Sequence, residues 1–233
     1  MSRNVAWPGP MRRPTRYPAT LATLMEEKNG EKYLKPYREA VEQYGPGFEA
    51  TLWNSREAQV LRFDVMIDLA NFDDCVVLDA GCGPGDLAAR LIERNVAFTR
   101  YVGIDAMAEI IETARARQLD RCEFRVADLL SVPAVLSEVE PDYICISGTL
   151  NTMDGDAARR LVSAAFEAAA QGVIFNFLSD RPHPRFEGKD LTPARRFDTV
   201  RWLDWSLGRS SRVSFTQAYL DGHDATIMIE HDG

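Results

Sequence analysis

Residues 76–91 read VVLDAGCGPGDLAARL, and this stretch decides the fold of the chain. An apolar run ends at Asp79, a turn carries glycines at positions 81, 83 and 85, and apolar residues then recur at helical spacing. The order is strand, tight turn and helix, which brings the backbone close to a nucleoside-containing ligand. Glycine permits that approach because it has no Cβ and readily adopts positive φ.

The residue after the third glycine argues against a dinucleotide. The fingerprint G-x-G-x-x-G, counted from Gly81 and Gly83, requires glycine at position 86, where this chain has Asp86. A carboxylate in the first helical turn suits the helix dipole but repels a pyrophosphate bound there. Asp79 adds further negative charge. The turn therefore favours a cofactor with positive charge and no phosphate, and S-adenosylmethionine, with its ammonium and sulfonium, fits.

Residues 79–85, DAGCGPG, resemble the first motif of the class I S-adenosylmethionine-dependent methyltransferases, D/E-x-G-x-G-x-G. Three later segments match this family in order, and they are residues 101–105, 122–129 and 141–147. The resemblance covers roughly residues 72–180. It implies a Rossmann-like three-layer α/β/α sandwich around a seven-stranded, mostly parallel sheet of order 3-2-1-4-5-7-6, with strand 7 antiparallel.

The apolar pattern independently predicts alternating strands and helices. Strands are expected at 75–79, 100–104, 122–126, 142–147 and 173–178, and helices at 85–94, 107–117 and about 156–170. Strands that alternate with helices at this spacing indicate a parallel sheet covered on both faces. Upstream, helices are expected at 22–28, 33–44 and 56 to about 70, the last capped by Asn54 or Ser55.

The chain after the fifth strand has a different pattern. Thr192-Pro193 predicts a helix that runs to about Leu207. Asp221-Gly222 predicts a hairpin between strands at about 212–219 and 223–230. A terminal antiparallel hairpin agrees with the sheet that the resemblance implies. The expected organisation is a disordered or lid-like tail at 1–20, a helical cap at 21–72 and the cofactor-binding domain at 73–233.

Composition limits the class of protein. The 233 residues are 45% hydrophobic and 27% charged, with a net charge of −8, which opposes binding to nucleic acid. No apolar run reaches membrane-span length and no secretory signal is visible, so a cytoplasmic protein without membrane contact is expected. The four cysteines form no C-x-x-C pair and the three histidines are not grouped; reduced thiols and no metal site are expected.

The resemblance implies roles around the cofactor. Asp79 and the glycine turn face the methionine end, Asp105 holds the ribose hydroxyls, and Asp128 reads the adenine amino group. Two of these acids have a second interpretation, since Asp105 and Asp128 are also common loop-capping residues. The full expected cofactor set is Asp79, Gly81, Cys82, Gly83, Gly85, Asp105, Ala106, Met107, Asp128, Leu129, Ser147, Gly148, Arg62 and Trp53.

The acceptor end is expected in two segments. Residues 53–63 resemble the helical caps of small-molecule methyltransferases, in which Arg62 pairs with the cofactor carboxylate and Trp53 walls the transfer site. Residues 181–201 are locally basic, which favours an anionic acceptor, although a solvated charged face explains both segments as well. The candidate acceptor-binding residues are Arg56, Arg181, Arg195 and Arg196, and His183 is the candidate general base.

The function that these features favour is methyl transfer to a small, possibly anionic, metabolite by in-line displacement, with S-adenosylhomocysteine as the product. The segment SGTLN at 147–151 lacks the N/D/S-P-P-Y/F/W motif of nucleobase amino methyltransferases. Two alternatives stay open: a non-catalytic S-adenosylmethionine-binding or scaffold protein, and a nicotinamide oxidoreductase, which Asp86 and the terminal hairpin disfavour. A monomer or a homodimer is expected.

Overall fold

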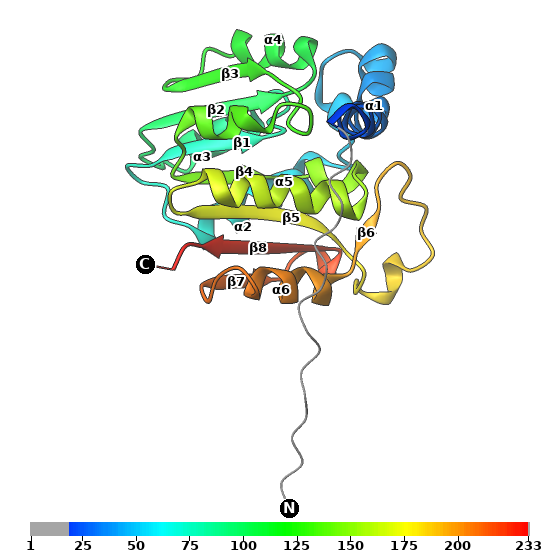
Figure 1. Ribbon diagram of the computed structural model, residues 1–233. Coiled ribbons are helices and arrows are strands. Elements are labelled where there is room, and N and C mark those ends of the chain that lie inside the picture. The colour runs from blue at the N-terminus through cyan, green and yellow to red at the C-terminus, as the bar shows by residue number, and fades with distance from the viewer. Residues whose placement is uncertain (1–18, 233) are drawn as a thin grey trace, which may run out of the picture.

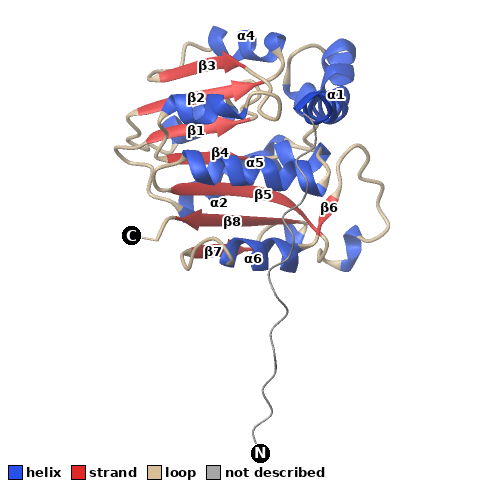
Figure 2. Ribbon diagram, in the orientation of Figure 1, coloured by secondary structure: helices blue, strands red, loops and turns tan. Residues whose placement is uncertain are grey.

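A computed structural model describes residues 19–232, and side chains from Lys32 onward. The described chain forms one mixed sheet with helices on both faces (Figures 1 and 2). The strands are β1 (Val76–Ala80), β2 (Arg100–Asp105), β3 (Cys122–Val126), β4 (Tyr143–Ile146), β5 (Gly172–Ser179), β6 (Arg196–Phe197), β7 (Val213–Thr216) and β8 (Asp224–Glu230). The helices are α1 (Ala19–Tyr44), α2 (Arg56–Leu69), α3 (Asp86–Glu93), α4 (Ala108–Ala116), α5 (Gly155–Ala168) and α6 (Thr199–Leu207).

The order of the strands is β3-β2-β1-β4-β5-β8-β7, and β8 runs antiparallel to both of its neighbours. This confirms the expected Rossmann-like sheet with an antiparallel strand near one edge. One strand was not expected: β6 adds to β5 through the pairs Leu178–Arg196 and Ser179–Phe197, so the described sheet has eight strands rather than seven. Its two residues are too short a run to show a strand pattern in the sequence.

Successive residues of each strand point to opposite faces of the sheet, where they pack into two hydrophobic cores. Leu78 of β1 and Ile144 of β4 pack with α5, with α6 and with the 3-10 helix η2 (Pro133–Val139) on one face. Val77 and Cys145 pack with α2, α3 and α4 on the other. The strands β1 to β5 run parallel to one another, which places their carboxyl ends at one edge of the sheet. In Figure 1, α1 lies beside that edge.

The upstream helices differ in part from the expected ones. Residues 19–44 form one helix, α1, in place of the two expected at 22–28 and 33–44, because neither Gly30 nor Pro36 ends it. Ser55 caps α2 by accepting a hydrogen bond from the N–H of Ala58 (3.1 Å). The 3-10 helix η1 (Phe48–Thr51) joins the two and packs against α1.

Within the expected cap, α2 belongs to the sandwich itself, since its Met66 is fully buried in the same core as α3 and β1. The expected tail at 1–20 lies almost wholly outside the described residues. No helix of the described part is both long and apolar enough to cross a bilayer.

Two expectations for the C-terminal third were wrong in detail. The helix expected from Thr192 begins at Thr199, where the Asp198 side chain accepts from the N–H of Arg201 (2.9 Å) and supplies the cap. The hairpin between β7 and β8 forms, but its last pair is Thr216–Thr226. Asp221-Gly222 therefore lies in a 3-10 turn, η5 (Leu220–Gly222), inside a longer loop.

Candidate functional site

The glycine turn after β1 is fixed to the neighbouring strand. The N–H groups of Gly81 and Cys82 both donate to the carbonyl of Ile104 (2.7 and 3.1 Å). Gly81 has φ of 88°, and a Cβ there would collide with the side chain of Thr149. Gly83 has φ of 54°, and a Cβ there would meet only Thr51, at 3.7 Å. The turn is thus closed at Gly81 and open at Gly83, where a ligand can approach the backbone.

A cavity of about 760 Å³ lies above this turn, at the carboxyl ends of β1, β2 and β4. We call it the first cavity. The expected cofactor residues that line it are Trp53, Asp79, Gly81, Cys82, Gly83, Asp105, Ala106, Met107, Leu129, Ser147 and Gly148. The side chains that sequence reasoning missed include Tyr33, Leu34, Tyr37, Thr51, Gln59, Phe63, Ile110 and Thr149.

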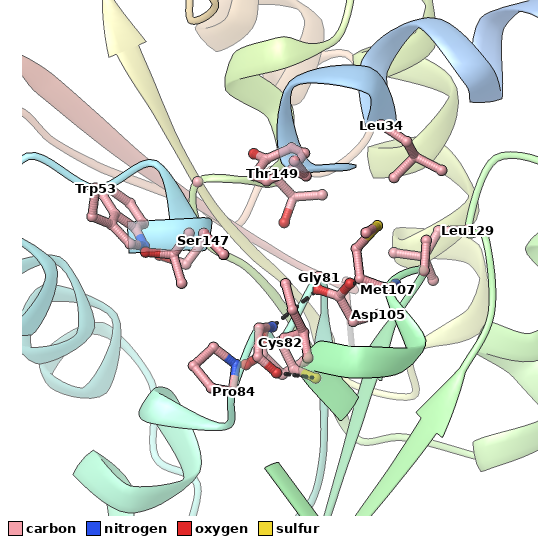
Figure 3. Close-up of a pocket in the computed structure, with 18 of the residues that line it drawn as sticks. Leu34, Trp53, Gly81, Cys82, Pro84, Asp105, Met107, Leu129, Ser147 and Thr149 are labelled. Atoms are coloured by element: carbon pink, nitrogen blue, oxygen red, sulfur yellow. Dashed lines mark hydrogen bonds between the residues drawn. The ribbon is translucent and has the colours of Figure 1, made fainter. Parts of the chain in front are cut away.

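The first cavity has two ends of different character. Leu34, Met107 and Leu129 gather at one end, close to Asp105, while Trp53 and Ser147 stand at the other (Figure 3). Leu34 and its neighbour Tyr33 come from α1, so this helix forms one wall. The i, i+4 spacing of Tyr33 and Tyr37, which places both on one face of a helix, is a sequence signal that could have found this wall.

Two carboxylates face the first cavity, the half-buried Asp105 and the buried Asp79. Asp105 accepts hydrogen bonds from the N–H groups of Met107 (2.9 Å) and Gly83 (3.1 Å), and burial raises its pKa. Asp79, only 3% exposed, accepts from the hydroxyl of Tyr101. Burial raises the pKa of Asp79 to about 7, and the charge of Asp105 acts in the same direction. Within residues 32–232, no cationic side chain bonds to either carboxylate, so a cationic ligand would stabilise both in the ionised form.

The charge of Asp86 is partly compensated. Its carboxylate accepts from Arg117 (2.7 Å) and from the buried Gln59 (3.2 Å). Repulsion of a pyrophosphate at the start of α3 is therefore weaker than the sequence suggests, because a guanidinium stands beside the carboxylate.

Three expected cofactor residues are engaged elsewhere. Gly85 backs onto the ring of Phe124, where a Cβ would approach to 2.8 Å, so it serves the packing of the turn. Asp128 accepts from the hydroxyl of Tyr33 (2.8 Å) and caps its own loop through the N–H of Leu130 (3.0 Å). Neither residue lines the first cavity.

Arg62 is the third of these expected cofactor residues. In the structure it pairs with Asp224 and not, as expected, with the cofactor carboxylate. Its Nε and Nη2 donate to the two carboxylate oxygens of Asp224 at 2.7 and 2.6 Å, and Asp224 is fully buried. The bidentate pair occupies Nε and Nη2, and Arg62 lines the second cavity rather than the first. Among the polar residues of α2, Gln59 and Arg62 are buried, while Arg56 is exposed over the ring of Phe48.

A second cavity of about 940 Å³ adjoins the first. Tyr37, Thr51, Trp53 and Gly148 line both. Trp53 stands at the junction: the guanidinium of Arg62 lies 4.5 Å from its ring centroid, and a Cβ on Gly148 would lie 2.5 Å from its Cζ2. Gly148, whose φ is 78°, is therefore required for the placement of this indole. Arg62, His223, Asn151 and residues 190–194 complete the second cavity.

The structure separates the expected acceptor-binding residues from this cavity. Arg181 and His183 are exposed, and His183 caps the short helix η4 (Pro184–Phe186) by accepting from the N–H of Arg185 (3.2 Å). This position, in a surface turn outside both cavities, argues against the expected role of His183 as a general base. Arg195 and Arg196 line a separate surface depression. His223 is the histidine that lines the second cavity.

Comparison with known proteins agrees with this geometry. Residues 71–175 match a family model described as a methyltransferase domain. A trans-aconitate 2-methyltransferase from Azoarcus sp. (strain BH72) is 44% identical over 57 residues, which cover 24% of this chain and 22% of that protein. The match therefore spans about a fifth of the length of this curated relative.

Solved structures share the fold at low identity. Magnesium protoporphyrin IX methyltransferase from Synechocystis PCC 6803 with bound S-adenosylhomocysteine is 15% identical with a TM-score of 0.59, covering 91% of this chain and 100% of that one. The small RNA methyltransferase HEN1 is 12% identical with a TM-score of 0.63, covering 75% and 25%. With the sheet order, these findings show a methyltransferase domain over residues 71–175 and the Rossmann-like fold of S-adenosylmethionine-dependent methyltransferases.

Across the described residues, no three His, Cys, Asp or Glu side chains are grouped so that they could hold a metal ion.

Proposed function

We propose that this protein transfers the methyl group of S-adenosylmethionine to a small organic acceptor by in-line displacement. The observation that carries the proposal is the pair of adjoining cavities, which share Trp53 and Gly148 at their junction. Two sites that meet at one point are what a transfer between two bound molecules requires. We further propose that it acts in the cytoplasm, as a monomer or homodimer, without a nucleic-acid substrate.

The residues of the first cavity fit the cofactor. When bound, S-adenosylmethionine supplies an electrophilic methyl group on a sulfonium. The apolar end formed by Leu34, Met107 and Leu129 suits the adenine ring, and Asp105 has lone pairs left for the ribose hydroxyls. Asp79 suits the ammonium, because a positive charge beside it offsets the burial that raises its pKa. Gly83 leaves room for the methionine end.

The second cavity suits the acceptor. Trp53 and Tyr37 bound it on the side of the first cavity and would exclude water from the transfer site. The expectation of an anionic acceptor rested on the basic stretch at 181–201. Of the arginine side chains in this stretch, Arg196 is the one that bonds to a residue of this cavity, His223.

Two measurements test the proposal. Calorimetry should detect S-adenosylmethionine binding with no binding of NAD, since a dinucleotide would contradict the assignment of the first cavity. A screen of small metabolites for release of S-adenosylhomocysteine should then find an acceptor. Tight cofactor binding with no turnover on any class of acceptor would favour the alternative, a non-catalytic binding or scaffold protein of the same fold.

A further inference from the structure

A compact group of charged residues lies against the inner wall of the second cavity. Arg62 and His223 line it and are only 5% and 8% exposed, and Asp224, which holds Arg62, is fully buried. Arg196, half-buried on β6, stands behind His223 and donates from Nη2 to its Nδ1 (3.1 Å). These four residues, called the inner cluster below, come from α2, β6, the loop before β8 and β8 itself.

The contact with Arg196 fixes the state of the histidine ring. A guanidinium only donates hydrogen bonds, so Nδ1 of His223 must be the acceptor and the proton of the neutral ring sits on Nε2. Burial lowers the pKa of His223; the charge of Asp224 opposes this effect, and the charges of Arg196, Arg62 and Lys189 add to it. The ring is therefore neutral at pH 7, with Nε2–H as a donor. Its other side stacks on Phe186 (4.4 Å between centroids), which holds the ring in place.

The inner cluster carries one more positive than negative charge. Arg62 and Arg196 are cations, Asp224 is the one carboxylate bonded to either of them, and His223 is neutral. The other hydrogen bonds of Arg196 go to the backbone carbonyls of Ser179 (2.6 Å) and His223 (3.4 Å). A partly buried guanidinium bonded only to neutral groups is stabilised by an anion nearby.

Two further carboxylates near the cluster do not remove this excess. Asp180 caps the N–H of Thr199 (3.0 Å) and faces Arg181, an exposed cation, at 4.0 Å. Asp190 lines the second cavity, but it is exposed and accepts from the N–H of Thr192 (2.9 Å). The exposed negative charge of Asp190 and the buried positive excess of the inner cluster would orient an anionic ligand with its charged group toward the cluster.

Two N–H groups of the inner cluster can donate hydrogen bonds to such a ligand. Nε and Nη2 of Arg62 are used by Asp224, and no hydrogen bond of Nη1 to any residue from 32 to 232 is formed. Nε2–H of His223 is likewise without a partner in that part of the chain. Both side chains line the same cavity. Two N–H donors on a positively charged wall match the two oxygens of a carboxylate.

We propose that the second cavity selects an acceptor that bears a carboxylate, and that Nη1 of Arg62 and Nε2–H of His223 bind that carboxylate, with Arg196 as the positioning residue that sets the tautomer of His223. The inference rests on the proposed function. It assigns to His223 a donor role in binding and not the role of a general base, since Nδ1 is occupied and Nε2 carries the proton.

The experiment compares acids with their amides. Protein saturated with S-adenosylhomocysteine is titrated by calorimetry with hexanoate and hexanamide, benzoate and benzamide, and succinate and succinamide. At least one acid should bind tenfold or more tightly than its amide, because the amide lacks the charge that the inner cluster compensates. If every amide binds as well as its acid, or no acid binds, the proposal is overturned.

Variants then assign the effect to the cluster. Arg196→Gln should weaken acid binding at least tenfold, whereas Arg195→Gln, the same charge change on an exposed neighbour outside the second cavity, should not. His223→Phe keeps the stacked ring and should lose the preference for acids, and His223→Gln, which can place an N–H near the position of Nε2, should restore part of it. Equal losses in the two arginine variants, or full acid preference in His223→Phe, would overturn the inference.

Cofactor binding separates the two proposals. All four variants should bind S-adenosylmethionine with unchanged affinity, because the inner cluster lies outside the first cavity, and this also shows that they are folded. If the unmodified protein binds S-adenosylmethionine and methylates neutral acceptors only, the inference on the carboxylate fails while the proposed function stands. If the unmodified protein fails to bind S-adenosylmethionine, the proposed function itself fails, and the inference with it.

Discussion

The affinity of the first cavity for S-adenosylmethionine should rise with pH and level off above pH 7. The cause is Asp79, whose pKa is raised to about 7 by burial and by the charge of Asp105. A cationic ligand beside Asp79 binds its ionised form, so a proton must leave whenever the ligand binds below that pKa. Above pH 7 the carboxylate is already ionised and its titration no longer affects binding.

The size of the effect follows from the pKa. At pH 6 about a tenth of Asp79 is ionised when its pKa is about 7, whereas at pH 8 nearly all of it is. The association constant should therefore fall about tenfold between pH 8 and pH 6, which corresponds to about 1.4 kcal/mol. The amino group of the ligand titrates on the alkaline side and limits the useful range to pH 8 and below.

The assay is calorimetry from pH 5.5 to 8 in buffers of different ionisation enthalpy, which reports the proton released. The matched control is Asp79→Asn, which keeps the shape of the side chain and has no proton to lose. Its binding should be weaker at pH 8 and nearly independent of pH. A wild-type affinity that is flat from pH 6 to 8, or a pH dependence that survives in Asp79→Asn, would refute the role assigned to this carboxylate.

Three further outcomes are expected. Asp105→Ala should weaken S-adenosylmethionine binding at least tenfold in calorimetry, because charge-assisted hydrogen bonds to the ribose are lost; unchanged affinity would remove Asp105 from the site. Gly81→Ala should lower the melting temperature and abolish cofactor binding, since the new Cβ collides with Thr149 at a φ of 88°, and Thr149→Ala should relieve part of the loss in melting temperature. Asp224→Leu should reduce the free energy of unfolding, measured in urea, by about 3–5 kcal/mol, because it leaves Arg62 buried without a partner. The double variant Arg62→Met, Asp224→Leu should lose less stability. An equal or larger loss in the double variant would contradict the pairing argument.

Sequence alone determined the sheet and the cofactor turn, because both depend on local patterns. The alternation of strands and helices, the glycines at 81, 83 and 85 and the acid at the end of the second strand are each set within a few residues of the chain. The sheet order follows from these elements and the family resemblance, and the structure has it. Where a local signal misled, as at Thr192-Pro193, a better cap further along the chain, Asp198, set the start of α6.

Tertiary structure alone decided the acceptor side. Arg62 meets Asp224 across 162 positions of sequence, and Arg196 meets His223 across 27. No periodicity or motif encodes such pairs, since they depend on how α2, β6 and β8 pack around the same edge of the sheet. The sequence singled out Arg62 and His183 for functional roles, but packing turned Arg62 toward Asp224, left His183 on the surface and brought His223 to the second cavity. Contacts between distant segments follow from the packing of the whole domain, and only the folded chain shows them.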